Sequence, residues 1–267
     1  MTALAARRRH PLALVLLIAL GLLATGALYA ALAPKPAAAS TASASDIEQG
    51  HKLFIANCAS CHGLNAEGTR KNAKGEVAGP SLIGVGAAAV DFQVGTGRMP
   101  LTFPGPQGMK KPNTFTDEQI SQMAAYVASL APGPVVPASE YTDGSKGDPA
   151  RGGEIFRVNC AMCHNFTGAG GALTRGKWAP ALDGVSGKHI YEAMITGPQS
   201  MPVFNDSNIT PEQKQDVIAY LNAVNSDPNQ GGSSLGSMGP VSEGLFVWIV
   251  GIGGLIGCAV WLGAKAA

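Results

Sequence analysis

The hydrophobic residues of this chain are concentrated in two long uncharged runs, one near each end of the sequence. They occupy residues 11–33 and 245–264, and each run is long enough to cross about 30 Å of hydrocarbon as a helix. Trp248 and Trp261 lie near the two ends of the second run, where amphipathic rings prefer the membrane interface. The pattern therefore predicts a C-terminal transmembrane helix over residues 244–264.

The first run has two interpretations. Three arginines, Arg7 to Arg9, precede it, and the positive-inside rule then predicts a transmembrane helix whose far end lies outside the cytoplasm. Alternatively, residues 1–33 form a cleaved signal segment, because Ala31-Leu32-Ala33 has the character of a small-residue cleavage site. Both interpretations export the rest of the chain. We expect a cell-membrane protein, multi-pass or anchored at its C-terminus, whose central region is extracytoplasmic.

Polar, low-complexity segments divide the region between the two hydrophobic runs. Their composition offers nothing that could build a hydrophobic core. They predict a tether at residues 34–45, a Pro-rich linker at 131–147 and a second linker at 227–243. Two domains remain between these segments, residues 46–130 and residues 148–226.

The two predicted domains are copies of one another. Residues of the first recur in the second with a constant offset in number, which chance does not explain. The pairs are Asp46/Asp148, Gly50/Gly152, Phe54/Phe156, Asn57/Asn159, Cys58/Cys160, Cys61/Cys163, His62/His164, Met99/Met201 and Pro100/Pro202. The register shifts after the last pair, because the first copy carries an insertion around residues 104–113.

Each copy is predicted to begin and to end with a helix. Residues 47–56 and 151–158 have helical patterns that run into the cysteine pairs. Thr116 and Thr210 suit helix N-caps, since acidic residues follow both, and Pro211 suits the first helical position. The fold class is therefore expected to be mainly α.

Cysteine and histidine recur at the spacing that attaches a c-type haem. Cys58-Ala-Ser-Cys61-His62 and Cys160-Ala-Met-Cys163-His164 both match the C-x-x-C-H pattern. Two thiols one helical turn apart can add to the two vinyl groups of one porphyrin, and the following histidine then lies beneath the iron. A structural zinc site is an alternative, but it leaves the repeated Met-Pro pair unexplained. A redox-active Cys-x-x-Cys is another, but it usually lacks the histidine. We predict two covalently bound haems c.

An iron that only carries electrons needs a sixth ligand, and Met99 and Met201 are the candidates. Both lie at the same distance along the chain after their histidine, and both precede a proline that fixes the local backbone. The remaining methionines and histidines are not expected to bind iron. Met123 and Met194 are expected in the core, Met109 in a loop, Met162 between the thiols, and His51 and His189 on the exposed surface.

On these residues the chain resembles class I cytochromes c, in which a Met-Pro loop supplies the distal iron ligand. Gly79-Pro80-Ser81-Leu82 and Ala179-Pro180-Ala181-Leu182 are similar to the family's loop whose proline carbonyl accepts a hydrogen bond from the proximal histidine. The resemblance covers both central domains. It implies two tandem class I cytochrome c domains between terminal transmembrane helices, with the last helix of each domain crossing the first.

The order of the parts resembles a narrower family, the dihaem cytochrome c subunit of the actinobacterial cytochrome bcc complex. This resemblance implies that the chain passes electrons from a Rieske iron-sulfur protein to an aa-type cytochrome oxidase, in place of a mobile cytochrome c. Its partners would be the cytochrome b and Rieske subunits, the oxidase and the membrane. The chain would then be a subunit of a proton-translocating quinol–cytochrome c oxidoreductase, with no catalytic site of its own.

Three alternatives stay open, and charge removes one further class of function. The dihaem subunit of cbb-type oxidases has its anchors before its haem domains, and the cytochrome subunit of membrane alcohol dehydrogenases typically carries three haems. A haem sensor or peroxidase would need one haem without a methionine ligand. The net charge of +1 gives no strongly basic face, so nucleic-acid binding is not expected.

Overall fold

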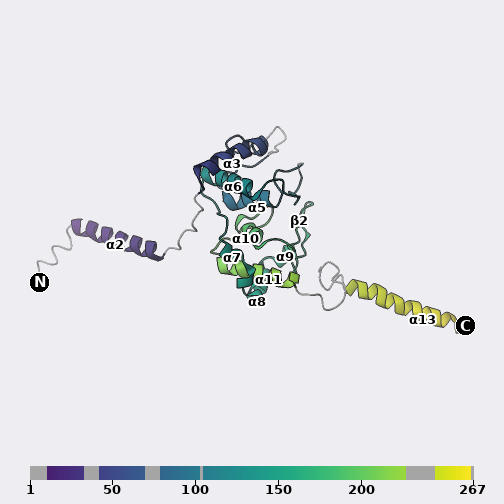
Figure 1. Ribbon diagram of the computed structural model, residues 1–267. Coiled ribbons are helices and arrows are strands. Elements are labelled where there is room, and N and C mark those ends of the chain that lie inside the picture. Colours follow the sequence, from purple (N-terminus) through teal and green to yellow (C-terminus); the bar gives the residue numbers. More distant parts are fainter. Residues whose placement is uncertain (1–10, 33–41, 70–78, 103–104, 227–243, 266–267) are drawn as a thin grey trace, which may run out of the picture. The chain divides into compact units, whose positions relative to one another are not determined.

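The computed structural model describes residues 11–32, 42–69, 79–102, 105–226 and 244–265. Within these residues the chain is mainly helical, as predicted (Figure 1). Several predicted features lie outside the described residues: the arginine cluster at 7–9, the tether as far as residue 41 and the linker at 227–243.

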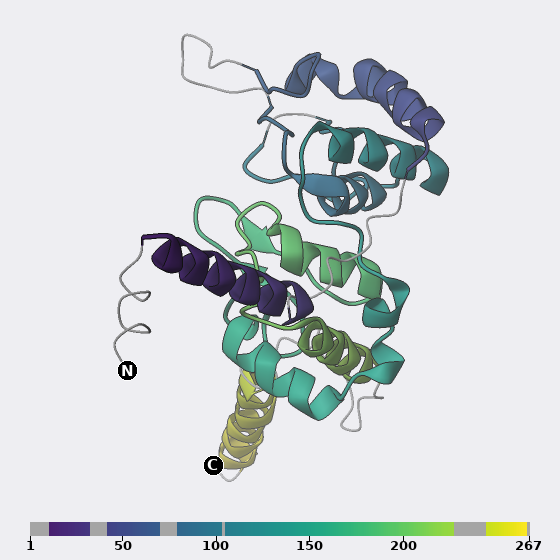
Figure 2. The same ribbon diagram turned by 90° about the vertical axis from the view of Figure 1, so that its left-hand side faces the viewer.

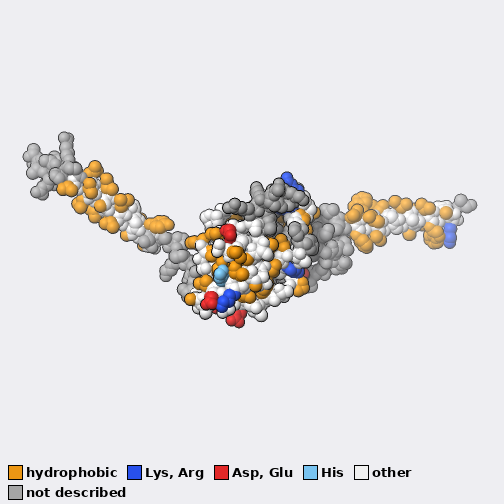
Figure 3. All heavy atoms as spheres, turned by 90° about the horizontal axis from the view of Figure 1, so that it is seen from above, with side chains coloured by type: hydrophobic (Ala, Val, Ile, Leu, Met, Phe, Trp, Pro, Cys, Tyr) orange, Lys and Arg blue, Asp and Glu red, His pale blue; other side chains and the backbone are white. Residues whose placement is uncertain are grey.

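Each end of the described chain is an apolar helix long enough to cross a membrane. The first is α2 (Pro11–Leu32), which contains a span with a mean hydropathy of 2.4. The second runs from Gly244 to Lys265 with a mean hydropathy of 2.3, and consists mainly of a π-helical segment, η3 (Val247–Ile252), followed by α13 (Gly253–Lys265). Hydrophobic side chains cover both helices and are exposed (Figure 3). The expected helices are therefore confirmed as candidate membrane spans.

The first central domain contains α3 (Ala44–Asn57), α4 (Ala59–His62), α5 (Gly86–Gly95) and α6 (Asp117–Leu130). Its first and last helices lie side by side (Figure 2). Gly50 is the point of closest approach, since a Cβ there would collide with the carbonyl oxygen of Gln122. Tyr126 packs on Phe54 with ring centroids 5.2 Å apart. The absence of a side chain at Gly50 therefore lets the two helices cross closely.

The second central domain repeats this arrangement with α8 (Pro149–Asn159), α9 (Ala161–His164), α10 (Gly187–Thr196) and α11 (Pro211–Ser226). Gly152 lies against the carbonyl oxygen of Asp216, and Phe156 packs on Tyr220 at 5.4 Å. The sequence did not predict a short antiparallel pair, β1 (Gly171–Ala172) and β2 (Trp178–Ala179). The crossing of first and last helices is thus shared by both copies.

The predicted helix starts are confirmed by their capping hydrogen bonds. Thr116 Oγ1 accepts from the amide of Gln119, whose side chain accepts in return from the Thr116 amide. Thr210 and Gln213 form the same reciprocal pair at the start of α11. Two amide hydrogens that a helix start leaves unpaired are satisfied in each case.

The segment between the two domains, predicted as a linker over 131–147, packs against both of them. The carbonyl oxygen of Pro134 accepts a 3.1 Å hydrogen bond from the amide of Ala88 in α5. Farther on, α7 (Ser139–Thr142) and η1 (Gly144–Lys146) lie against α11, where Gln215 Nε2 donates to the carbonyl of Asp143 at 3.0 Å. The segment is therefore attached at both ends.

The two central domains meet where α5 packs on α10 (Figures 1 and 2). Lys188 Nζ lies 2.7 Å from Asp91 Oδ1, and the ring of His189 meets the ring of Phe92 edge-on at 6.1 Å. The side chain of His189 is only 20% exposed. The prediction of a surface histidine was therefore wrong at His189, because the second domain is packed on the first. It is confirmed for His51, which is exposed and stacks on Tyr126.

Candidate haem sites

The first Cys-x-x-Cys-His motif lies at the junction of α3 and α4. Cys58 ends α3, and the amides of Cys61 and His62 both donate to its carbonyl oxygen, at 3.1 and 2.9 Å. This single helical turn holds the two thiols and the imidazole in a fixed order. Cys58 is partly buried, Cys61 is exposed and His62 is buried.

The second motif has the same backbone geometry at the junction of α8 and α9. The amides of Cys163 and His164 donate to the carbonyl oxygen of Cys160 at 3.1 and 2.9 Å. The equal distances in two independent copies mean that the motif itself sets the local structure. Here Cys160 is buried, and Cys163 and His164 are partly buried.

Each histidine ring is oriented by the carbonyl oxygen of a proline. His62 Nδ1 lies 2.7 Å from the oxygen of Pro80, and His164 Nδ1 lies 3.0 Å from that of Pro180. Because a carbonyl only accepts, Nδ1 carries the proton and Nε2 keeps its lone pair. The hydrogen bond expected from the resemblance is thus present in both domains.

The loop that supplies this carbonyl approaches the motif closely in the first domain. A Cβ at Gly79 would lie 2.5 Å from the carbonyl oxygen of Cys61 and 3.0 Å from His62 Nδ1. The second domain has Ala179 at this position, and its histidine–proline distance is the longer of the two. Glycine therefore permits the closer approach in the first copy.

The electrostatics of the thiols disfavour a redox-active cysteine pair. Burial, with a smaller contribution from Cys61, raises the pKa of the Cys58 thiol to about 11. Burial and Cys163 raise the pKa of Cys160 to about 11 as well. Catalytic cysteines in Cys-x-x-Cys motifs have lowered pKa values instead. Burial also lowers the pKa of His164, although its bond to Pro180 acts in the opposite direction, so the imidazole stays neutral, as iron ligation requires.

Met99 and Met201 each pack against the hydrophobic core of their own domain. The same core contacts Cys58 in the first domain and includes Cys160 in the second. The fold therefore brings the methionine and the cysteine motif of each copy to one core. The other methionines lie as predicted, with Met123 and Met194 buried and Met109 and Met162 exposed.

The structure shows further contacts near these loops that the sequence reasoning missed. Lys111 Nζ donates to the carbonyl oxygens of Gly97 and Pro100, which flank Met99. Gln107 bonds to the backbone of Trp178 in the second domain. Both residues belong to the insertion of the first copy. The sequence feature that could have pointed to these contacts is the position of the insertion, directly after the candidate ligand Met99.

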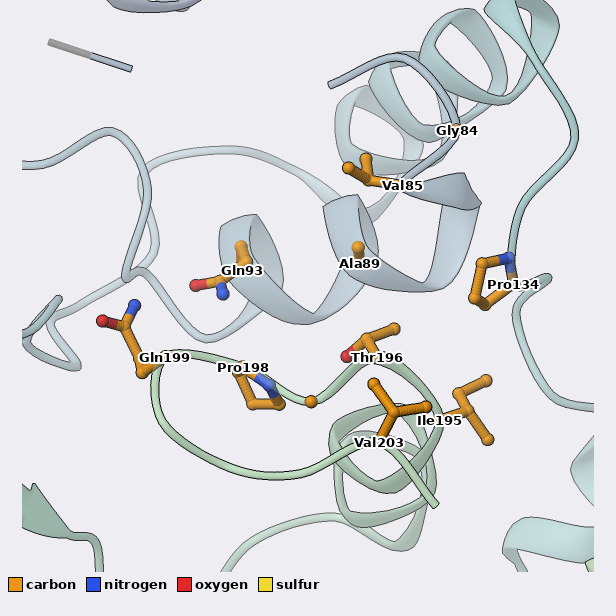
Figure 4. Close-up of a pocket in the computed structure, with 11 residues that line it drawn as sticks. Gly84, Val85, Ala89, Gln93, Pro134, Ile195, Thr196, Pro198, Gln199 and Val203 are labelled. Atoms are coloured by element: carbon orange, nitrogen blue, oxygen red, sulfur yellow. The ribbon is translucent and has the colours of Figure 1, made fainter. Parts of the chain in front are cut away.

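A cavity of 390 Å³ lies between α5 and the loop that leads to Met201 (Figure 4). Gln93 and Ala89 line it from the first domain, and Thr196 and Gln199 line it from the second. The cysteines and histidines of the two motifs are not among its lining residues. The cavity is therefore a feature of the contact between the domains and is separate from the attachment motifs.

The residues of both motifs fit a covalently bound haem c. All four motif cysteines have free thiols. Each histidine has Nδ1 engaged in a hydrogen bond, which leaves Nε2 for the iron, and a methionine packs against the core that contacts a cysteine of the same motif. Thiols, an imidazole and a thioether form the donor set of a haem c with His/Met ligation.

Comparison with known proteins agrees with this geometry. The family model described as cytochrome c matches residues 47–131, and the model described as cytochrome C oxidase, cbb3-type, subunit III, matches residues 147–221. Both central domains are therefore cytochrome c domains.

Relatives of nearly full length carry a single description, cytochrome bc1 complex cytochrome c subunit. The protein from Corynebacterium efficiens is 42% identical over 97% of this chain and 90% of its own length. The protein from Mycobacterium leprae is 44% identical over 94% of this chain and 87% of its own. A Cbb3-type cytochrome c oxidase subunit FixP from Sinorhizobium medicae is 33% identical, over only 30% of this chain. The chain, an electron-transfer protein with two covalently bound haems c, therefore belongs to the family of cytochrome bc1 complex cytochrome c subunits.

Proposed function

We propose that this chain carries electrons from a Rieske iron-sulfur protein to an aa-type cytochrome oxidase, on the extracytoplasmic side of the membrane. One observation carries the proposal most directly. The histidine–proline hydrogen bond occurs in both domains, next to a complete Cys-x-x-Cys-His motif and with a methionine at the same core. Two such sites in one chain suit a relay, in which an electron enters at one haem and leaves at the other.

The proposed residues have distinct tasks. Cys58 and Cys61 hold one haem through thioether bonds, and Cys160 and Cys163 hold the other. When bound, each haem supplies a one-electron iron couple. His62 and His164 would bind iron through Nε2, because the carbonyl oxygens of Pro80 and Pro180 accept hydrogen bonds from Nδ1 and fix each ring. Met99 and Met201 would supply the second protein ligand to each iron, and a His/Met ligand pair favours a relatively high potential.

The bcc complex is favoured over a cbb-type oxidase by the extent of the similarity. The cytochrome bc1 relatives match the chain over 94–97% of its length. The unmatched residues are too few to make up either terminal apolar segment, so the similarity extends into both. The cbb3-type relative matches only 30%. In addition, the apolar helix after the second haem domain does not fit a subunit whose anchors precede its haem domains.

The orientation in the membrane is part of the proposal. The arginines at 7–9 place the N-terminus in the cytoplasm, and the domains between the two spans then lie outside it. Lys265, at the end of the second span, agrees with a cytoplasmic C-terminus. Haem attachment outside the cytoplasm follows from this orientation.

Purification in a mild detergent, through a tag on this chain, tests the partners. We expect b-type haem, a Rieske protein and a copper-containing oxidase to travel with it, and menaquinol to drive oxygen consumption by the preparation. A dihaem protein that purifies alone, or with companions that lack a Rieske cluster, would contradict the proposed pathway.

The attachment residues have a separate test. Replacing Cys58 and Cys61 together by Ala should remove one of the two haems from the denatured chain, as measured by the haem-to-protein ratio. Replacing Cys160 and Cys163 should remove the other. Cys258→Ala, in the second apolar helix, is the matched control and should retain both. Retention of two haems by either double variant would refute the assignment.

A further inference from the structure

Three metal-ligating side chains meet at the contact between the haem domains, and the electron-transfer role uses none of them. Asp91 comes from α5, and His189 and Glu192 come from α10 (Figure 1). One ligand atom from each lies within 4.8 Å of the others. His189 and Glu192 are three residues apart in one helix, which places them on the same face.

Glu192 has no satisfying partner within the described part of the chain. Its side chain is 0% exposed, and neither of its carboxylate oxygens takes part in a hydrogen bond. His189 Nε2 lies 4.0 Å from Oε2, which is beyond hydrogen-bond distance. Leaving a buried carboxylate without a partner costs several kcal/mol. A group of opposite charge is therefore needed, or the carboxyl must be protonated.

The neighbouring cation does not meet this need. Lys188 Nζ lies 2.7 Å from Asp91 Oδ1, and that side chain is 43% exposed. Lys188 therefore contacts the carboxylate of Asp91 and not the fully buried carboxylate of Glu192. Because Lys188 reaches the cluster from the solvent side, it can leave Asp91 without disturbing the packed interior.

The backbone leaves room for the imidazole at the centre of the cluster. A Cβ at Gly95 would lie 3.1 Å from His189 Nε2, so glycine at this position keeps the ring nitrogen accessible. Nε2 lies 3.8 Å from Asp91 Oδ1 and 4.0 Å from Glu192 Oε2. Ligands bound to zinc at roughly 2.0–2.2 Å in a tetrahedron are about 3.4 Å apart. Small side-chain rotations would therefore complete the geometry.

The donor set selects the kind of metal. Zn²⁺ accepts both imidazole nitrogen and carboxylate oxygen ligands, whereas Ca²⁺ and Mg²⁺ prefer oxygen ligands only. We propose that Asp91, His189 and Glu192 bind one Zn²⁺ ion, with water as the fourth ligand, and that this ion joins the two haem domains. Asp91 belongs to the first domain and the other two ligands to the second, so the ion fixes the placement of one haem domain on the other.

The test uses the full chain with both haems, purified in detergent through a tag that contains no histidine. The sample is loaded with zinc, dialysed against a weak chelator, and analysed for zinc and iron by mass spectrometry. The chain is first separated from co-purifying subunits in a stronger detergent, so that its two covalent haems supply the iron of the sample, and the expected result is then one zinc for every two irons. His189→Ala should lower this ratio at least tenfold. His51→Ala, which changes an exposed histidine outside the cluster, should leave it unchanged.

A second measurement identifies the ligands. Zinc-edge X-ray absorption should show nitrogen and oxygen neighbours and no sulfur, and Glu192→Gln with unchanged haem content should also lose the metal. Three results would overturn the proposal: wild-type protein without zinc after loading, an equal zinc ratio in the His189→Ala and His51→Ala variants, or sulfur ligation, which would place the metal at a cysteine motif.

Discussion

The side-chain amide of Gln107 forms two hydrogen bonds with the backbone of Trp178, 71 residues farther along the chain. Nε2 donates to the carbonyl oxygen at 2.9 Å, and Oε1 accepts from the amide nitrogen at 3.0 Å. Gln107 belongs to the insertion of the first domain, and Trp178 belongs to β2 of the second. The insertion that breaks the repeat therefore contributes directly to the contact between the two haem domains.

Replacing Gln107 by Ala should loosen this contact. Two neutral hydrogen bonds contribute roughly 1–3 kcal/mol together, and about 1.4 kcal/mol is a tenfold change in an equilibrium. The Trp178 amide should therefore exchange its hydrogen roughly five- to 100-fold faster, as measured by hydrogen–deuterium exchange. Met109→Ala, an exposed change in the same insertion, should leave the exchange unchanged. Equal protection of Trp178 in both variants would show that the contact does not depend on Gln107.

The contact between the domains explains what could be predicted from the sequence and what could not. The sequence predicted the first and last helix of each domain, the N-caps Thr116 and Thr210, and the cysteine motifs, because each of these features depends on residues close in sequence or present in both copies. His189 was assigned to the surface because it has no repeat partner, and in the structure it faces Asp91 and Phe92 of the other domain. Comparison of two copies carries no information about residues that only one copy uses.

The packing of the predicted linker at 131–147 and the strands β1 and β2 were not predicted, for related reasons. Proline-rich composition predicts a spacer, but Pro134 offers a carbonyl oxygen to the amide of Ala88, and Asp143 offers one to Gln215. The two strands have two residues each, too few for the alternation by which strands are recognised. In both cases tertiary contacts decide a conformation that local composition leaves open.

Gly50 and Gly152 should tolerate no side chain. A Cβ at either position would collide with a backbone carbonyl of the helix that crosses it, so Gly50→Ala or Gly152→Ala must push two helices apart. Such overpacking costs roughly 1–3 kcal/mol, and we expect a decrease of several degrees in the melting temperature of the affected domain, measured by circular dichroism. Gln49→Ala, an exposed change on α3, is the control and should change stability by less than about 0.5 kcal/mol. Stability equal to that of the control would contradict the close crossing.

Asp216 should make the second domain sensitive to acid. Burial alone would raise the pKa of this carboxyl, but hydrogen bonds from Arg151 and from the amide of Asp148 lower it below its usual value of 3.8. A carboxylate with a lowered pKa in the folded state stabilises the fold above its unfolded-state pKa, and the contribution is lost as the pH falls through the folded pKa. Asp216→Asn should therefore lower the melting temperature at pH 7, and the difference from wild type should shrink below about pH 4.

A titration of melting temperature against pH measures this effect, with Glu154→Gln, exposed on α8, as the control. A difference between wild type and Asp216→Asn that stays constant from pH 7 to pH 3 would mean that the ionised carboxylate does not stabilise the domain.

Lys111 should hold the loop that carries Met99. Its ammonium group donates to the carbonyl oxygens of Gly97 and Pro100, on either side of the methionine. Lys111→Met keeps most of the side-chain volume and removes both hydrogen bonds, so the loop gains freedom and a larger fraction of the first haem should lack its methionine ligand. The expected signature is a partial decrease in the absorption that marks sulfur–iron coordination, together with unchanged haem content. Lys110→Met, at the neighbouring exposed position, should leave that absorption intact.

Met99 and Met201 should set the potentials of the two haems without contributing to their attachment. Met99→Ala or Met201→Ala leaves the thiols and the histidine–proline pair in place, so the covalent haem should be retained. Loss of the thioether removes the ligand that favours reduced iron, and axial ligands move haem potentials over about 0.8 V. We expect the potential of the affected haem to fall by on the order of 0.1 V or more in a redox titration. Met109→Ala and Met162→Ala, both exposed, are the controls. Unchanged potentials in both Met99→Ala and Met201→Ala would refute the ligand assignment, and a change in only one would confine methionine ligation to that domain.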